Sequence, residues 1–185
     1  MGYYRGFKAE AERLAVETRK ELGLTEYQRL DPRRLADHLD IPVFTLSDLE
    51  AREPSIGDAI RVLHGEDASS FSGLTLFSGT RRVIVHNEAH TPGRQSSDIA
   101  HELSHGLRLH PPAPIHDGRG CRTWNADHED EANFLAGALL IPAKAAWALV
   151  KRRKSLDEAA WEFGCSVEMV RWRINITGAG RQMAG

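Results

Sequence analysis

Apolar positions recur with a helical period over most of the chain and with a strand period in only a few segments. Near the start, apolar residues at steps of three and four predict a helix over about residues 6–22, which ends at Gly23. An Asp31-Pro32 pair predicts the N-cap and first turn of a short helix. Similar patterns predict further helices over about 54–64, 96–109 and 127–140.

Strand-like patterns lie in the first half of the chain. Residues 41–46 are apolar and β-branched enough for a strand, and residues 71–77 and 82–85 flank a Ser78-Gly79-Thr80-Arg81 turn that suits a hairpin. Proline and glycine in the segment 111–121 predict a loop. Helices, then a small sheet, then helices again indicate an α+β fold that is mainly helical.

The composition indicates one domain over residues 1–185 and argues against several classes of protein. With 24 Lys and Arg against 26 Asp and Glu, the net charge of −2 excludes a generally basic nucleic-acid binder. Two cysteines, Cys121 and Cys165, do not form a disulfide framework. No apolar run reaches the ~18 residues of a membrane span, and residues 1–20 lack the apolar core of a secretory signal, so we expect a cytoplasmic protein.

Charge is distributed unevenly along the chain. Residues 1–150 carry 17 basic and 22 acidic side chains, whereas the subregion 151–185 carries 7 basic and 4 acidic ones. This subregion contains a helix, a glycine turn and a Ser-capped helix over 155–174, which resembles a helix-turn-helix. Its second helix offers only Arg171 and Arg173 as cations, so we favour a packing unit over a DNA-reading unit. We expect its large apolar residues in the core: Trp161, Phe163, Trp172 and Ile174.

The segment His101-Glu102-Leu103-Ser104-His105 is an HExxH motif, the main chemical signal in the chain. On a helix, His101 and His105 lie about 40° apart and one turn along, so both imidazoles can reach one metal ion. Two neutral ring nitrogens hold zinc, and Glu102 on the same side takes a proton from the water that zinc binds. HExxH also occurs by chance on amphipathic helices, so the motif needs a third ligand in its support.

An open catalytic zinc site uses three protein ligands, and one way to supply the third is a later histidine. The HExxHxxGxxH pattern fails here, because Arg108 stands at the glycine position and Pro111 at the last histidine position. His110 is one residue out of place, and we interpret it as a surface or packing histidine.

The other way is an acidic residue from the helix predicted over 127–140. We choose Glu129 over Glu131, because Glu129 shares a helix face with Asn133, which could orient a ligating histidine. Glu131 points about 200° away from Glu129 around the helix. Acidic residues at this position also favour a helix N-terminus through its dipole, and the two roles are compatible.

Other reactive side chains have a simpler interpretation. Cys165 lies at the start of a predicted helix, where a thiolate would be favoured, but we expect a buried, apolar role. The remaining histidines have no ligand spacing, and we interpret them as ordinary: His38, His64, His86, His90, His116 and His128.

Taken in order, these motifs resemble the ImmA/IrrE family of metallopeptidase-like proteins over about residues 10–176. The matching segments are Leu35-Ala36, Ser72-Gly73, Val83-Ile84-Val85-His86-Asn87, Ala100 to His105, Leu109-His110, Glu129 to Ala136 and Leu139 to Pro142. The resemblance implies a zincin-like core of gluzincin type, in which Glu102 is the base and three residues bind the metal: His101, His105 and Glu129. It also implies a partner, a helix-turn-helix repressor of the XRE type that is cleaved or inhibited.

The leading hypothesis is a zinc-dependent regulatory endopeptidase that acts on such a repressor. Two histidines and a glutamate suit zinc and would also accept manganese or iron. A second hypothesis is a non-hydrolytic toxin or anti-repressor of a toxin–antitoxin pair, which binds the repressor without cleaving it. A third is DNA binding through residues 155–176, which a salt-dependent DNA-binding assay would test.

Overall fold

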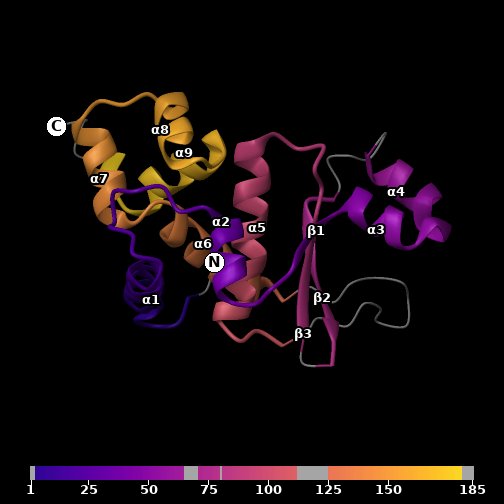
Figure 1. The fold of residues 1–185 in the computed structure, drawn as a ribbon. Helices are drawn as coiled ribbons and strands as arrows, with labels where there is room; N and C mark the ends of the chain where they lie inside the picture. Colours follow the sequence, from indigo (N-terminus) through magenta and orange to yellow (C-terminus); the bar gives the residue numbers. More distant parts are fainter. Residues whose placement is uncertain (1–2, 65–70, 80, 112–124, 181–185) are drawn as a thin grey trace.

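The computed structural model describes residues 3–64, 71–79, 81–111 and 125–180. Within these ranges the chain forms nine α-helices, one short 3-10 helix and a three-stranded sheet, so the fold is α+β and mainly helical, as predicted (Figure 1). The helices are α1 (Phe7–Glu21), α2 (Pro32–His38), α3 (Leu46–Arg52), η1 (Pro54–Ile56), α4 (Gly57–His64), α5 (Pro92–Leu107), α6 (Ala126–Leu140), α7 (Ala143–Lys151), α8 (Leu156–Phe163) and α9 (Val167–Ile176). The strands are β1 (Val43–Thr45), β2 (Gly73–Ser78) and β3 (Arg81–His86).

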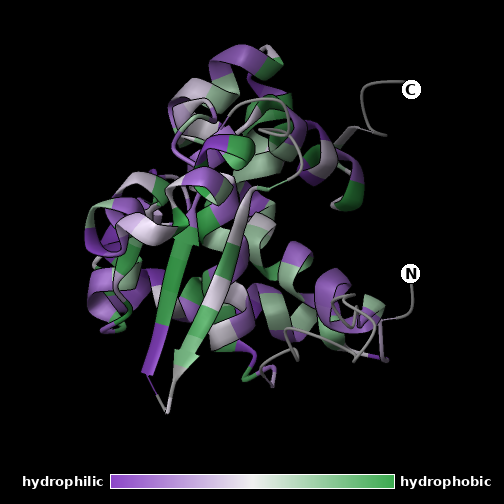
Figure 2. Cartoon of the chain, turned by 90° about the vertical axis from the view of Figure 1, so that its right-hand side faces the viewer, coloured by the Kyte–Doolittle hydropathy of each residue, from purple (hydrophilic) through white to green (hydrophobic). Residues whose placement is uncertain are grey.

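The sheet has the strand order β1-β3-β2 and separates two groups of helices. β2 and β3 form the predicted antiparallel hairpin, and β1 pairs with β3 in parallel. Ile84 of β3 packs in the core that contains α5, whereas its neighbour Val85 packs with Leu76 against α3 and α4. Strand alternation therefore buries both faces of β3. Figure 2 shows the hydrophobic residues along the two long strands, with hydrophilic residues at the hairpin end of one of them.

Helices α5 and α6 lie at the centre of the molecule, packed against each other and, through α6, against α1. Their shared core contains fully buried side chains from all three helices: Phe7, Ala11, Leu103, Leu135 and Leu139. Burial of one such large side chain contributes about 1.5–3 kcal/mol, so this contact fixes how α5 and α6 lie relative to each other.

Two buried arginines tie neighbouring helices to the C-terminal end of α6. The guanidinium of Arg19 on α1 donates to the Leu139 carbonyl. Nε of Arg173 on α9 donates to the Ile141 carbonyl at 2.7 Å, and the same side chain pairs with Glu12 of α1. Both arginines are fully buried. Carbonyls at a helix end have no partner within the helix, so the arginines satisfy groups that would otherwise be buried unpaired.

The sequence pattern does not predict α3 or α7. α3 has only seven residues, and its signal is the capping box in which Thr45 and Asp48 each bond to the other's backbone amide. α7 follows Pro142 directly, so the proline that ends α6 also occupies the N-cap position of the next helix. Both helices are too short for their apolar residues to show a clear helical period, so only the residues at their boundaries indicate them.

Helices α8 and α9 form the predicted helix-turn-helix-like unit. Gly164 ends α8 in the left-handed conformation, with φ of 65°, and Ser166 caps α9 by accepting from the Met169 amide. Phe163 is buried as predicted, but the prediction for Trp161 is wrong, because this residue is 85% exposed. The two aromatics lie two positions apart, about 200° around the helix, and cannot share its buried face. Two further residues are partly buried against the core: Trp172 and Ile174.

None of the helices in the described ranges is long and apolar enough to cross a membrane alone. α6 and α7 together pass the same test of length and composition, as a pair bent by 58°.

Candidate metal centre

Helix α5 carries the HExxH motif and packs against α6. Thr91 caps α5 by accepting from the Arg94 amide, and Pro92 occupies the first turn, so the helix begins four residues before the predicted position. The helix places His101 and His105 one turn apart, with their Nε2 atoms 3.1 Å from each other. Only 21% and 16% of these side chains are exposed, so both rings are held by the surrounding protein.

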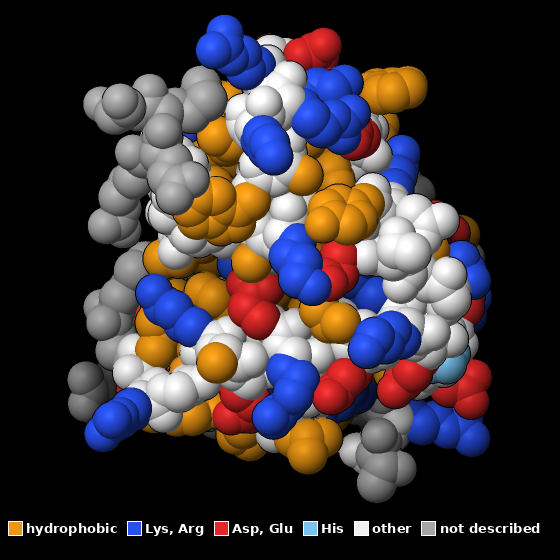
Figure 3. Space-filling view, turned by 90° about the vertical axis from the view of Figure 1, so that its left-hand side faces the viewer, with side chains coloured by type: hydrophobic (Ala, Val, Ile, Leu, Met, Phe, Trp, Pro, Cys, Tyr) orange, Lys and Arg blue, Asp and Glu red, His pale blue; other side chains and the backbone are white. Residues whose placement is uncertain are grey.

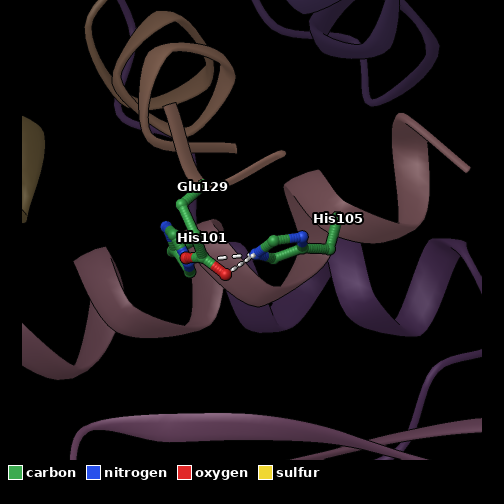
Figure 4. A group of neighbouring side chains, drawn as sticks. All are labelled: His101, His105 and Glu129. Carbon is green, nitrogen blue, oxygen red and sulfur yellow. Dashed lines mark hydrogen bonds and ion pairs between the residues drawn. The ribbon is translucent and has the colours of Figure 1, made fainter. Parts of the chain in front are cut away.

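Glu129 reaches the two histidines from the first turn of α6 (Figure 4). Asn125 caps this helix by accepting from two backbone amides, which fixes where the first turn begins. One carboxylate oxygen of Glu129 lies 3.1 Å from Nε2 of His101, and the other lies 3.6 Å from Nε2 of His105. The structure therefore brings the three predicted ligands together.

The spacing of these ligand atoms fits a metal ion. Zinc binds nitrogen and oxygen at about 2.0–2.1 Å, and a tetrahedron with bonds of this length has an edge of about 3.3 Å. Nε2 of His101 lies 3.1 Å from Nε2 of His105 and 3.1 Å from one oxygen of Glu129, both close to that edge. With one ligand atom taken from each residue, all three atoms lie within 4.8 Å of one another. Within the described part of the chain, no other group of histidine, cysteine and acidic side chains is close enough to share an ion.

A hydrogen bond on the far side of His101 sets which of its ring nitrogens carries the proton. Nδ1 of His101 lies 3.0 Å from the side-chain oxygen of Asn133, a contact that the spacing of Asn133 and Glu129 anticipates. The oxygen accepts, so Nδ1 carries the proton and Nε2 presents its lone pair to the centre of the cluster. This is the form of histidine that binds a metal.

The charges around the cluster favour a cation at its centre. Burial lowers the pKa of His101, but the Glu129 carboxylate, the Glu102 charge and Asn133 outweigh burial and raise the pKa overall. Burial raises the pKa of Glu129, but His101 and His105 outweigh it and hold the pKa well below its usual range. Both shifts stabilise positive charge next to the carboxylate, as a metal site requires.

Glu102 lies between α5 and the sheet. Its Oε2 accepts a hydrogen bond of 2.7 Å from the Thr75 hydroxyl on β2, and only 7% of the residue is exposed. Gly73 on the same strand lies beside Glu102, and a Cβ there would come within 3.2 Å of the Val85 carbonyl on β3. The sequence does not predict the role of Thr75, since its only signal is the strand alternation that places it beside Gly73.

His110 and Glu131, which the spacing rules exclude as ligands, lie together behind His105. Nδ1 of His110 is 2.9 Å from Nδ1 of His105, and Nε2 of His110 is 3.2 Å from a Glu131 oxygen. Glu131 also accepts from Arg108, whose guanidinium reaches Glu10 on α1. Burial lowers the pKa of His110 and outweighs the raising effect of Glu131. His110 is therefore buried rather than on the surface, and its interpretation as a packing residue leaves out its polar contact with His105.

The remaining reactive residues lie outside the ligand group. Cys165 is buried, and burial raises the pKa of its thiol to about 12, so it has the apolar role predicted for it. Besides His110, five histidines with described positions are not part of the cluster: His38, His64, His86, His90 and His128. Cys121, His116 and most of the loop predicted over 111–121 lie outside the described residues.

A cavity of about 530 Å³ lies beside His101 and Glu129. Its walls come from α5, α6 and α9, and Met169 and Trp172 of α9 supply apolar surface. The volume is in the range of ligand-binding pockets. The second helix of the helix-turn-helix-like unit is therefore one wall of the space next to the predicted ligands.

Comparison with protein-family models yields a match over most of the chain. The model of a peptidase family, described as the IrrE N-terminal-like domain, matches residues 36–175. The matched range contains the HExxH helix, Glu129, α8 and most of α9, and it excludes α1. None of the curated proteins matches the chain.

Proposed function

This chain belongs to the ImmA/IrrE family, and from that premise we propose that it is a metal-dependent endopeptidase that acts on a helix-turn-helix repressor. The family supports peptidase activity of the IrrE type. One observation supports it most for this chain: His101, His105 and Glu129 bring one ligand atom each to within 4.8 Å of one another, and Glu102 follows His101 on the same helix.

His101, His105 and Glu129 would hold the metal in a site of gluzincin type, with zinc as the expected ion and manganese or iron as alternatives. A divalent metal in this site would polarise the peptide carbonyl and lower the pKa of a water molecule toward neutrality. The two rings and the carboxylate would remain in place throughout, since each is partly buried and held by neighbouring residues.

Glu102 would act first as a general base and then as a general acid. It would take a proton from water as the new carbon–oxygen bond forms, and deliver that proton to the amide nitrogen as the carbon–nitrogen bond breaks. The Thr75 hydroxyl donates to one oxygen of this carboxylate and would keep it from rotating away from the substrate. This hydrogen bond holds the Glu102 side chain, which α5 carries, against strand β2 of the sheet.

A protein partner is proposed rather than DNA. Arg173, one of the two cations on the second helix of the helix-turn-helix-like unit, is fully buried and paired with Glu12. On the face shown in Figure 3, acidic side chains lie between the basic ones, which weakens any attraction to phosphate. The same helix, α9, lines the cavity beside His101, where a bound polypeptide would contact it.

The test combines the purified chain with a small helix-turn-helix repressor, and any such repressor encoded beside its gene is the first to be tried. Wild-type protein should hold about one equivalent of divalent metal and cleave the repressor. Glu102→Gln keeps the shape of the side chain but removes the base, so metal content, folding and repressor binding should survive. Hydrolysis should fall by roughly 10²–10⁴, the usual contribution of a general base.

Two other outcomes would contradict the proposal. If Glu102→Gln remains fully active in the cell, the chain works by binding, as a toxin or anti-repressor. If the isolated chain binds duplex DNA tightly, with an affinity that falls steeply with salt, the helix-turn-helix-like unit is a DNA reader.

A further inference from the structure

Behind His105, polar side chains form a chain of contacts that leads away from the ligand cluster. The contacts run from His105 to His110, from His110 to Glu131 and from Glu131 to Arg108. We propose that His110 and Glu131 are positioning residues, which fix the ring orientation and tautomer of His105 and so raise the metal affinity of the site. The inference rests on the metal site of the proposed function and adds residues that the ligand set does not include.

The end of helix α5 explains how His110 reaches this position. α5 ends with two reversed hydrogen bonds, from the Leu109 amide to the Gly106 carbonyl at 2.9 Å and from the His110 amide to the His105 carbonyl at 3.0 Å. Leu109 adopts the left-handed conformation, with φ of 55°. This is a Schellman ending, and it turns the backbone so that the side chain of His110 lies behind the ring of His105. His110 thus contacts His105 although its spacing does not match that of a third ligand.

The two ends of the chain of contacts determine where each proton lies. Arg108 can only donate and an ionised Glu131 can only accept, so Nε2 of His110 donates to Glu131. A neutral His110 has one ring proton, which leaves its Nδ1 as an acceptor. Nδ1 of His105 must then carry the proton, and Nε2 of His105 keeps the lone pair that faces the cluster.

Both histidine ligands are therefore held in the same tautomer by different means. His101 is held by Asn133, which lies one turn along α6 from Glu129. His105 is held by the contacts through His110 to Glu131, which we call the relay. Partners that hold the second nitrogen of a metal-binding histidine typically contribute 10–100-fold to metal affinity. Since Glu131 and Glu129 lie on one helix, the same element supplies a ligand and the end of the relay.

His110 also has a packing role, which the test must separate from the proposed one. Its ring stacks on His128 with centroids 4.3 Å apart, and only 7% of the residue is exposed. His110→Phe keeps the volume and the stacking but removes both polar contacts. His110→Asn places an acceptor near the position of Nδ1 and should restore the contact with His105. His128→Phe is the matched control, because it changes the stacking partner and leaves the relay intact.

The experiment measures zinc affinity by competition with a chromophoric chelator, and the visible spectrum of the cobalt-loaded protein. We expect zinc binding to weaken by about 10–100-fold in His110→Phe, with a changed cobalt spectrum, and to recover most of that loss in His110→Asn. His128→Phe should stay within about threefold of wild type. Thermal unfolding in excess chelator reports the packing contribution separately.

Each contrary outcome has its own meaning. If wild type binds zinc and His110→Phe binds it equally well, the relay does not position His105, while the proposed function stands. A loss of stability in chelator with unchanged zinc affinity would assign His110 to packing alone. If wild type binds no metal, the relay and the proposed function both fail.

Discussion

Glu88, just after strand β3, caps a helix that is distant in sequence. Its carboxylate accepts from the backbone amides of Leu46 and Ser47 at 3.0 and 2.9 Å, and from the Ser47 hydroxyl. Burial raises the pKa of Glu88, but the bonds from the Ser47 hydroxyl, the backbone amides and His64 outweigh it and lower the pKa to about 2. One side chain thus joins α3 to the end of β3 and stabilises the start of the helix.

This carboxylate should make the stability of the protein pH-dependent. A pKa lowered by folding stabilises the native state above the unfolded pKa of about 4.5, and that contribution is lost as the pH falls toward 2. Glu88→Gln should reduce the free energy of unfolding by about 1–2 kcal/mol at pH 7, and by roughly half as much at pH 3. Urea denaturation at the two pH values measures the difference.

The exposed carboxylate of Glu17 provides the control for Glu88. Glu17 is 57% exposed and faces Arg13 at 3.9 Å on the surface of α1. Glu17→Gln should change the free energy of unfolding by less than about 0.5 kcal/mol at both pH values. A difference for Glu88→Gln that stays constant between pH 7 and pH 3 would contradict the electrostatic explanation.

At the scale of helices, Arg173 links α9 to both α1 and the end of α6. Its removal leaves the Glu12 carboxylate without its buried counter-ion and the Ile141 carbonyl without its donor. Arg173→Met should therefore lower the free energy of unfolding by about 3–5 kcal/mol. Chemical denaturation measures the loss, and circular dichroism reports whether the helices persist.

Arg171, on the exposed side of the same helix, is the matched control for Arg173. Arg171→Met should change stability by less than about 0.5 kcal/mol. Equal effects of the two substitutions would mean that the buried pair does not hold α9 in place. Because Arg173 is fully buried, its charge cannot contact nucleic acid and does not count as evidence for DNA binding.

Relations that lie within one helix could be predicted from the sequence, whereas relations between elements could not. Helical geometry suffices to place His101 beside His105, and Glu129 on the face of Asn133. The contact of Thr75 with Glu102 requires the packing of β2 on α5, which no local pattern contains. The same holds for whole helices. Long apolar periods predict α1 and α6, whereas the short helices α3 and α7 are indicated only by the residues at their boundaries.

At the scale of the whole molecule, α1 lies outside the range that the family model matches, yet it is attached to the site by a polar contact. Arg108, which donates to Glu131 at the end of the relay, also forms an ion pair of 2.6 Å with Glu10 and a hydrogen bond of 3.2 Å with Tyr4. The first helix therefore shares a cation with the residues that hold a predicted metal ligand.

Because Arg108 contacts both α1 and Glu131, metal binding and the docking of α1 are expected to affect each other. If docking of α1 strengthens metal binding through Arg108, metal binding must strengthen the docking of α1 by the same factor. We expect the α1 amides to exchange hydrogen for deuterium more slowly in zinc-loaded protein than in chelator-treated protein, and Arg108→Gln to remove that difference. Equal exchange in both states would show that α1 is uncoupled. With coupling, the N-terminal helix becomes a remote reporter of metal occupancy, readable without any substrate.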